Sequence, residues 1–236
     1  MIPWELLDSA PVPGSGATLR LHKRGAEFSI RVQNRELMNS RVHGSENTLA
    51  ELACARIHGS RPRVLIGGLG MGYTLAAALH RLGAQAQLIV VELVPAVVAW
   101  NQGPLAGLAG HPLEDPRVTV RTGDVAEILR AGRERYDAIV LDVDNGPEGL
   151  TRQGNIWLYT PPGLEAAYAA LRPAGVLAIW SAVPDKRFAR HLRQAGFAVE
   201  EVTVRAGGNS NGERRTIWIA TRTGSGRRES RPPSSR

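Results

Sequence analysis

The sequence contains a single cysteine, Cys54, among its 236 residues. One thiol cannot form an internal disulfide or a cysteine-built zinc site, so both kinds of scaffold are excluded. No run of 18 apolar residues is present that could form a membrane-spanning helix. The first residues also lack the basic segment and apolar stretch of a secretory leader. We therefore expect a cytoplasmic protein in which the thiol is buried and inert.

Aromatic residues are also scarce, at 5% of the chain, and they do not alternate with basic residues as a nucleic-acid stacking surface requires. The formal net charge of +7 is concentrated in residues 221–236, which hold five arginines and one glutamate. The rest of the chain is nearly neutral, so a nucleic-acid partner is not expected. The six histidines show no H-x-x-x-H or H-E-x-x-H spacing, so we predict no metal site.

Apolar segments alternate with helix-forming segments from residue 63 onward. Strands are predicted at 63–66, 87–91, 117–121, 137–141, 176–180, 197–204 and 216–220. Apolar strands separated by helices are typical of a parallel sheet that is covered on both faces. Only a loop separates the last two strands, so the last strand is expected to run antiparallel. The predicted fold class is α/β, with a Rossmann-like, doubly wound, mostly parallel seven-stranded sheet.

The segment before this series has a weaker pattern. Residues 1–17 are rich in Pro, Gly and Ser and are expected to be irregular. Two short segments around Arg24-Gly25 predict a short β-hairpin. We divide the chain into an irregular N-terminus with this hairpin (1–45), an α/β domain (46–220) and a disordered basic tail (221–236).

A glycine-rich turn follows the first strand of the series, with Gly68, Gly70 and Gly72 before the next helix. Glycines in such a turn allow a sharp change of direction and the close approach of a ligand. The dinucleotide fingerprint G-x-G-x-x-G would need a further glycine, which neither Tyr73 nor Leu75 supplies. This spacing disfavours an NAD site, and a tight packing turn without a ligand is the alternative.

Acidic residues stand at the ends of the next three strands. Glu92 follows the second strand, where a carboxylate can accept hydrogen bonds from both ribose hydroxyls of a nucleoside. Asp124 follows the third strand and can cap the next helix, contact an adenine amino group, or do both. Asp142 and Asp144 follow the fourth strand, where open α/β sheets bind their ligands, so they are candidates for binding a cation and for a general base. An Asx-type turn is the alternative for Asp144.

Together these motifs resemble the adenosylmethionine-dependent transferase fold and, more narrowly, the spermidine synthase family. The similar segments are 64–72, 115–118, 123–124, 136–142, 158–160 and 171–175. The first corresponds to the family's strand and Gly-Gly-Gly-Asp-Gly motif, and 136–142 corresponds to the strand that leads to its catalytic aspartate. The resemblance extends over residues 25–220.

The resemblance implies that domain 46–220 binds adenosylmethionine or its decarboxylated form, without a metal. Its expected cofactor contacts are Gly67, Gly68, Gly70, Gly72, Glu92, Leu93, Gly123, Asp124 and Val125. Its expected catalytic residues are Asp142 and Asp144. Its expected substrate contacts are His43, Glu46, Asp144 and Tyr159.

The sequence departs from the family pattern on the acceptor side. Where the family has Asp-Ser-Ser/Thr-Asp-Pro-x-Gly-Pro, residues 142–147 read Asp-Val-Asp-Asn-Gly-Pro. The aspartate of the glycine motif, which in the family contacts the transferred aminopropyl arm, is replaced by Met71. The upstream Tyr-His-Glu corresponds only to His43 and a displaced Glu46. The acceptor is therefore not specified by the resemblance.

Three functions are compatible with this pattern. The first is aminopropyl transfer from decarboxylated adenosylmethionine to a small amine, with Asp142 as the base and Asp144 near a second ammonium. The second is methyl transfer from adenosylmethionine to a small molecule. The third is a non-catalytic nucleoside-binding protein that keeps the fold. A small amine is the expected partner and a homodimer the default assembly, and no membrane partner is expected.

Overall fold

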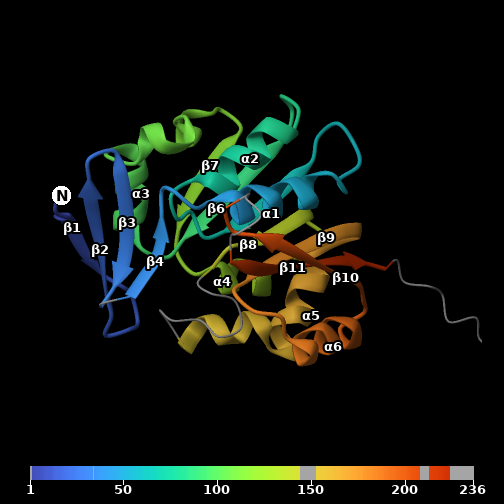
Figure 1. The fold of residues 1–236 in the computed structure, drawn as a ribbon. Helices are drawn as coiled ribbons and strands as arrows, with labels where there is room; N and C mark the ends of the chain where they lie inside the picture. Colours follow the sequence, from blue (N-terminus) through green and yellow to red (C-terminus); the bar gives the residue numbers. More distant parts are fainter. Residues whose placement is uncertain (1, 34, 144–152, 208–212, 224–236) are drawn as a thin grey trace, which may run out of the picture.

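The computed structural model describes residues 2–33, 35–143, 153–207 and 213–223. These residues form a four-stranded antiparallel sheet at the N-terminus and a seven-stranded mixed sheet with helices on both faces (Figure 1). Side chains from the small sheet and from the strand ends of the large sheet line one cleft. The relation between the two sheets therefore positions the candidate site.

The N-terminal sheet has the strand order β1-β2-β3-β4. Its strands are β1 (Glu5–Pro11), β2 (Thr18–Arg24), β3 (Glu27–Val32) and β4 (Arg35–Asn39). The predicted hairpin is present as β2 and β3. The prediction that residues 1–17 are irregular is wrong for residues 5–11, which form β1 and pair with residues 18–23 of β2. No side chain of β1 is buried, so its sequence carries no apolar alternation, and backbone pairing alone defines the strand.

The large sheet has the strand order β10-β11-β9-β8-β5-β6-β7. Its strands are β5 (Arg63–Gly67), β6 (Gln87–Glu92), β7 (Val118–Thr122), β8 (Tyr136–Leu141), β9 (Leu171–Ser181), β10 (Phe197–Arg205) and β11 (Arg214–Arg222). The strands from β7 across to β9 are parallel, whereas β11 is antiparallel to both β9 and β10. This arrangement confirms the predicted fold class, including the antiparallel last strand.

Two apolar layers hold helices against the two faces of the large sheet. The helices α1 (Gly44–Cys54), α2 (Tyr73–Arg81) and α3 (Pro95–Gln102) pack on one face. The helices α4 (Val125–Ala131), α5 (Pro161–Ala170) and α6 (Lys186–Gln194) pack on the other. Short 3-10 helices lie at Ala106–Ala109, Pro112–Glu114 and Gln153–Tyr159. Burial on both faces explains why the central strands β5, β6 and β8 are mostly apolar, whereas the edge strands β7 and β10 carry polar residues.

The order of the strands reverses between β5 and β8. The chain runs from β5 to β6 and β7 on one side, then crosses back to β8 and β9 on the other. At such a switch point the connecting segments leave the sheet in opposite directions, which opens a crevice beyond the carboxyl ends of the strands. The glycine turn after β5 and Asp142 after β8 both stand at this crevice.

Two further predictions concern Cys54 and membrane spans. Cys54 is buried at the end of α1, as predicted, and burial raises the pKa of its thiol to about 12. The thiol therefore stays protonated and unreactive at neutral pH. Within the described ranges, no helix has the length and apolar character needed to cross a lipid bilayer.

Candidate active site

The glycine turn joins the end of β5 to the start of α2. Gly68 and Gly72 have φ angles of +90° and +85°, which residues with a Cβ rarely adopt. A Cβ on Gly68 would lie 2.2 Å from the backbone oxygen of Asp142, so the turn packs directly against the end of β8. The Gly68 amide donates to the Val91 carbonyl, and the Asp142 amide donates to the Gly67 carbonyl, both at 2.9 Å. One turn thus connects the ends of β5, β6 and β8.

Glu92 ends β6, and its carboxylate lines the cleft beside the glycine turn. Its Oε2 accepts the backbone N–H of Leu69 and its Oε1 accepts that of Val94, both at 2.9 Å. The side chain is 8% exposed, so its orientation is set by the protein. A carboxylate of fixed orientation therefore lines the cleft beside the glycine turn, and its contact with the ribose of a nucleoside stays a prediction.

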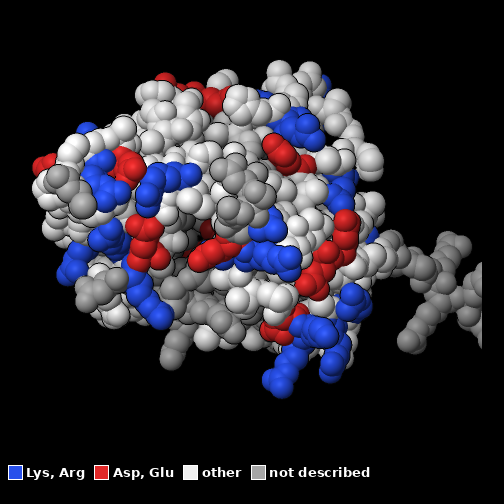
Figure 2. Space-filling view, in the orientation of Figure 1, with Lys and Arg blue, Asp and Glu red and all other residues white. Residues whose placement is uncertain are grey.

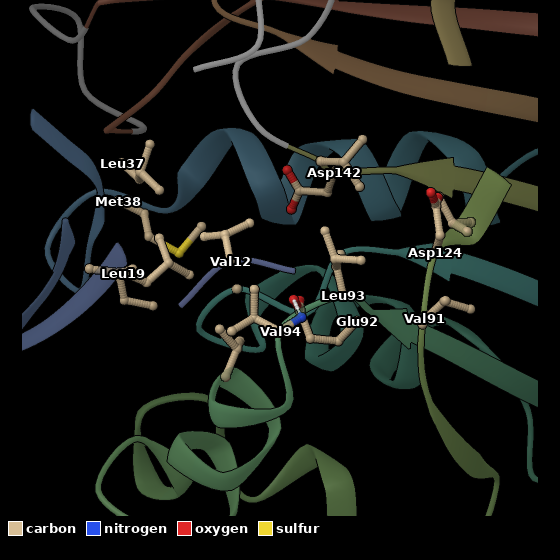
Figure 3. Close-up of a pocket in the computed structure, with 17 residues that line it drawn as sticks. Val12, Leu19, Leu37, Met38, Val91, Glu92, Leu93, Val94, Asp124 and Asp142 are labelled. Atoms are coloured by element: carbon tan, nitrogen blue, oxygen red, sulfur yellow. Dashed lines mark hydrogen bonds between the residues drawn. The ribbon is translucent and has the colours of Figure 1, made fainter. Parts of the chain in front are cut away.

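An open cleft with a cavity volume of about 130 Å³ lies between the two sheets (Figure 3). The large sheet and the turns after its strands contribute Gly68, Gly70, Val91, Glu92, Leu93, Val94, Val97, Gly123, Asp124, Val125, Asp142 and Val143. The small sheet and its first turn contribute Val12, Leu19, Ile30, Leu37 and Met38. Apolar walls with a few fixed polar groups are typical of a site for a small organic ligand.

Asp124 stands at the end of β7, on the rim of the same cleft. Its carboxylate accepts the backbone N–H of Ala126 at 2.9 Å, which confirms the predicted cap of α4. The preceding Gly123 amide donates to the Glu92 carbonyl at 2.9 Å. The helix cap and a contact with an adenine amino group are compatible at this position, and the second stays a prediction.

Asp142 follows β8 and lines both the cleft and a smaller hollow beside it, whose cavity volume of about 10 Å³ has room for a single water-sized group such as an ammonium. The smaller hollow is lined by Met38, Asn39, Glu46, Leu69, Gly70, Met71, Tyr73, Thr74 and Asp142. Thr74, at the start of α2, donates its hydroxyl to Oδ2 of Asp142 at 2.6 Å. Glu46 brings a second carboxylate from α1. An ionised carboxylate is costly to bury without a partner, and two of them in one hollow also repel each other. A cationic group in the hollow would pair with both, so the hollow can hold such a group.

Both carboxylates of the smaller hollow have raised pKa values. The pKa of Asp142 is raised to about 7, chiefly by burial and then by the charge of Glu46, against the opposing hydrogen bond from Thr74. Burial also raises the pKa of Glu46, although the Ser45 hydroxyl donates to it at 2.6 Å. A carboxyl group that titrates near neutral pH can take a proton from a substrate and release it again.

Two predicted substrate contacts, His43 and Tyr159, do not line the smaller hollow. His43 stacks on Tyr73, with ring centroids 3.9 Å apart, but only Tyr73 lines the hollow. Tyr159 is buried and donates its hydroxyl to the Val143 carbonyl at 3.2 Å, and it lines neither cavity. Asp144 lies outside the described residues. Among the predicted substrate contacts that the structure describes, Glu46 is the one that shares a hollow with Asp142.

Several residues that shape the site were not predicted. Asn101 on α3 is buried and donates its side-chain amide to the Gly70 carbonyl at 2.8 Å, which supports the glycine turn. Two of the predicted cofactor contacts, Gly67 and Gly72, pack closely against their neighbours and line neither cavity. The apolar wall from the small sheet was also missed. Alternating residues such as Leu19 predict a half-buried sheet without indicating what the buried face covers.

The raised pKa of Asp142 predicts a pH-dependent stability difference in the variant Asp142→Asn. In the unfolded chain this carboxyl titrates near 3.8 and in the folded protein near 7. The folded state therefore binds the extra proton between these values, and stability is lost as pH rises through this window. Asparagine cannot ionise. The free energy of unfolding of Asp142→Asn, relative to that of the wild type, should therefore rise by at most about 3 kcal/mol from pH 5 to pH 7 and then level off. Denaturant unfolding at pH 5, 7 and 8 measures this.

Asp115→Asn is the matched control for this measurement. A hydrogen bond from Arg117 lowers the pKa of Asp115, so its contribution to stability is lost only at pH values below its ordinary range. The difference between Asp115→Asn and the wild type should therefore be constant between pH 5 and pH 8. An equally constant difference for Asp142→Asn would show that the carboxyl at position 142 does not titrate near neutrality.

Comparison with known protein families gives one domain match. Residues 43–191 match the family model described as spermine/spermidine synthase domain. Among curated proteins, putrescine N-methyltransferase 2 of Nicotiana attenuata is 32% identical over 187 residues, which cover 72% of this chain and 48% of that protein. Polyamine aminopropyltransferase 1 of Streptomyces coelicolor is 29% identical over 156 residues, which cover 63% of this chain and 28% of that protein.

Comparison with solved structures supports the same fold. Spermidine synthase from Thermotoga maritima superposes with a TM-score of 0.74 at 18% identity, over 92% of this chain and 72% of that one. At this identity the likeness establishes the architecture alone. The chain spans about half the length of the putrescine N-methyltransferases that it matches.

Proposed function

The chain belongs to the spermine/spermidine synthase domain family, and we propose that it transfers an alkyl group from a sulfonium nucleoside to the nitrogen of a small amine. One observation carries this proposal. The Asp142 carboxyl is half-buried, hydrogen-bonded by Thr74, and lines both the cleft at the glycine turn and the acidic hollow beside it. It thus stands where a nucleoside and an amine would meet.

The proposed step forms a C–N bond and breaks a C–S bond. The unprotonated amine attacks the carbon attached to the sulfonium, and the electron pair of the broken bond stays on sulfur, which leaves as a neutral thioether. The nitrogen then loses a proton, which Asp142 accepts. A pKa of about 7 lets this carboxyl be ionised before the step and release the proton afterwards. The protein otherwise contributes by alignment and by excluding water.

Aminopropyl transfer from decarboxylated adenosylmethionine is the first candidate. The charged residues that line the two cavities are Glu46, Glu92, Asp124 and Asp142, and no lysine or arginine lines them among the described residues. The ammonium of an aminopropyl arm is compatible with such an acidic lining. The α-carboxylate of intact adenosylmethionine would lack a cationic side-chain partner in it. This charge pattern favours the decarboxylated donor.

Methyl transfer is the second candidate, and Met71 favours it. Met71 lines the smaller hollow, at the position where the family resemblance places the aspartate that contacts the aminopropyl arm. Its side chain is buried and apolar, so the glycine turn supplies no carboxylate to the arm. Putrescine N-methyltransferases are also among the curated relatives. The acceptor in either case is proposed to be a small amine.

Product analysis by mass spectrometry tests the function. The protein is incubated with adenosylmethionine or its decarboxylated form and each of a panel of small mono- and diamines. We expect one donor to yield an alkylated amine together with the matching adenosyl thioether. Amine carrying a methyl group identifies the second candidate, and amine carrying an aminopropyl group the first. A protein that binds the nucleosides but forms no product with any amine would instead be the non-catalytic binding protein.

The remaining expectations from the sequence are also proposals. We infer a cytoplasmic enzyme that acts as a homodimer and needs no metal. Among the described residues, no group of three His, Cys, Asp or Glu side chains is arranged to hold a metal ion. Activity that survives dialysis against a chelator would support metal-independent transfer, and sedimentation analysis would give the assembly.

A further inference from the structure

The cleft and the acidic hollow share three lining residues, Met38, Gly70 and Asp142. If the nucleoside occupies the cleft and the amine the hollow, as the proposed function requires, the reacting carbon must lie between them. These three residues therefore form a neck around the substituent on the sulfur. Gly70 has no side chain and Asp142 is the proposed base, so Met38 is the residue whose size sets the width of the neck.

A β-bulge aims Met38 into this neck. In the β3–β4 ladder, Ile30 pairs with Met38, whereas the next residue, Arg31, pairs with Glu36, so Leu37 is the extra residue. Successive side chains of a regular strand point to opposite faces of the sheet. Because of the bulge, the consecutive residues Leu37 and Met38 both line the cleft (Figure 3). Bulges commonly redirect side chains beside active sites.

The tip of Met38 lies directly on Gly70. A Cβ placed on Gly70 would be 2.8 Å from Cε and 3.1 Å from Sδ of Met38. The thioether group therefore occupies the space that any side chain at position 70 would need. A larger substituent on the sulfur would have to displace the same atoms, whereas a methyl group would require little room.

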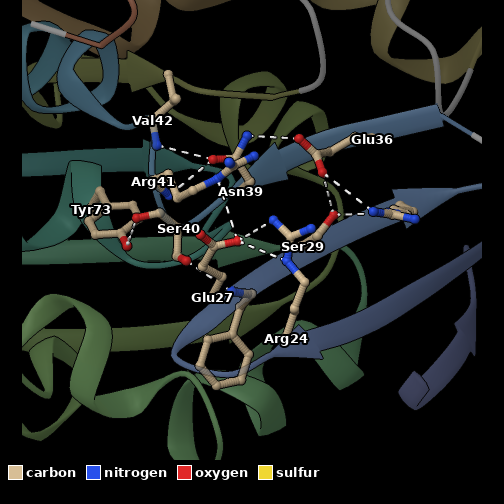
Figure 4. A network of polar contacts seen from close by, with 11 residues as sticks. Arg24, Glu27, Ser29, Glu36, Asn39, Ser40, Arg41, Val42 and Tyr73 are labelled. Carbon is tan, nitrogen blue, oxygen red and sulfur yellow. Dashed lines mark hydrogen bonds and ion pairs between the residues drawn. The ribbon is translucent and has the colours of Figure 1, made fainter. Parts of the chain in front are cut away.

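Backbone contacts hold the bulged strand in this position (Figure 4). Just after β4, the Ser40 amide donates to the Phe28 carbonyl, and the Phe28 amide donates to the Ser40 hydroxyl, both at 2.9 Å. The Tyr73 hydroxyl donates to the Ser40 carbonyl at 3.2 Å. Since Tyr73 begins α2 directly after the glycine turn, these contacts connect the strand that carries Met38 to the turn beneath it. These contacts, and not the packing of Met38 alone, therefore hold the neck in position.

We propose that Met38 determines which donor the site accepts, by limiting the size of the group attached to the sulfur. This inference rests on the proposed function only in placing a nucleoside thioether or sulfonium in the cleft. Shortening Met38 should therefore shift the preference of the site towards a larger substituent than the wild type accepts best. One methylene in an apolar pocket changes discrimination by about 10–200-fold, so removing the outer atoms of a methionine produces a measurable change.

Binding of two adenosine thioethers tests the proposal without requiring turnover. The probes are 5′-methylthioadenosine and the analogue that carries a 3-aminopropyl group on sulfur. Titration calorimetry gives the ratio of their affinities for the wild type and each variant. Met38→Ala is expected to shift this ratio about tenfold or more towards the aminopropyl thioether. Met38→Leu, which keeps the volume, should retain the wild-type ratio.

Leu37→Ala is the matched control, because Leu37 lines the cleft but not the smaller hollow. It should change the affinities of both probes by similar factors and leave their ratio unchanged. Met38→Val gives a milder truncation with β-branched geometry and is expected to shift the ratio in the same direction, which covers the case in which Met38→Ala does not fold.

The outcomes separate the two proposals. If both probes bind and the ratio is the same in the wild type, Met38→Ala and Met38→Val, the inference on Met38 is wrong while the nucleoside site stands. If neither probe binds the wild type, the nucleoside site is wrong and the inference on Met38 is overturned with it. A shift of equal size in Leu37→Ala would show that loosening of the small sheet, and not Met38, sets the preference.

Discussion

Asp142→Asn is expected to lower turnover by about 10²–10⁴-fold, the usual contribution of a general base. Asparagine has the same shape and can still accept the hydroxyl of Thr74, which donates to Oδ2 of Asp142 at 2.6 Å in the wild type. It cannot take a proton from the attacking amine. Affinity for 5′-methylthioadenosine should therefore stay within a few-fold of the wild type while product formation falls. Steady-state kinetics and calorimetry on the same preparation measure the two effects.

Asp137→Asn provides the matched control on the same strand. Asp137 lies in β8, accepts the Arg63 amide at 2.7 Å and pairs with Arg172 at 2.8 Å, and it lines neither cavity. Its replacement should lower stability without a comparable loss of turnover. Full activity in Asp142→Asn would remove the proposed base from the mechanism. Loss of nucleoside binding in that variant would instead assign Asp142 a structural role.

Gly68→Ala is expected to have the largest effect on the nucleoside site. Gly68 has a φ of +90°, and its new methyl group would lie 2.2 Å from the backbone oxygen of Asp142. Rotation of a side chain cannot relieve a clash with backbone, so either the turn or the end of β8 must move. The strained φ and the overlap together should cost about 3 kcal/mol or more of folding stability. Binding of 5′-methylthioadenosine should fall at least tenfold, because both moving parts line the cleft.

Gly72→Ala separates backbone strain from this clash. Gly72 has a similar φ of +85°, but the nearest atoms to its added methyl group belong to the side chains of Asn101, at 3.0 Å, and Pro112, at 3.2 Å. Gly72 also lines neither cavity. We expect a loss of stability with little loss of nucleoside affinity. Denaturant unfolding and calorimetry compare the two variants, and equal effects on both quantities would contradict the special role of Gly68.

The central part of the fold could be predicted because its signals are local. The glycines that follow an apolar run, as after β5, indicate both where the strand ends and that a tight turn follows. Parallel strands present their carboxyl ends at one edge, so acids that follow different strands must meet there. Glu92, Asp124 and Asp142 reach the same cleft for this reason, and each was identified from its place after an apolar run.

The N-terminal sheet could not be predicted in the same way. The side chains of β1 are all at least partly exposed, so the only evidence for this strand is its pairing with β2. The bulge at Leu37 is likewise a property of the β3–β4 ladder and leaves no pattern in the five residues of β4. The sequence therefore does not predict the cleft wall that these strands form, because the wall exists only when the two sheets pack together.

The chemistry of the site can likewise be predicted from the sequence only in part. The order of residues was sufficient to indicate a nucleoside-binding α/β domain, because glycine conformation, strand ends and parallel topology are short-range or generic properties. The meeting of Glu46 with Asp142, residues from α1 and the end of β8, depends on how a helix packs across the sheet. Packing partly buries both carboxylates, brings their charges together and raises the pKa of Asp142 to about 7. Residues that are distant in the sequence become buried and close to one another only when the chain folds. A local sequence pattern therefore cannot predict these properties.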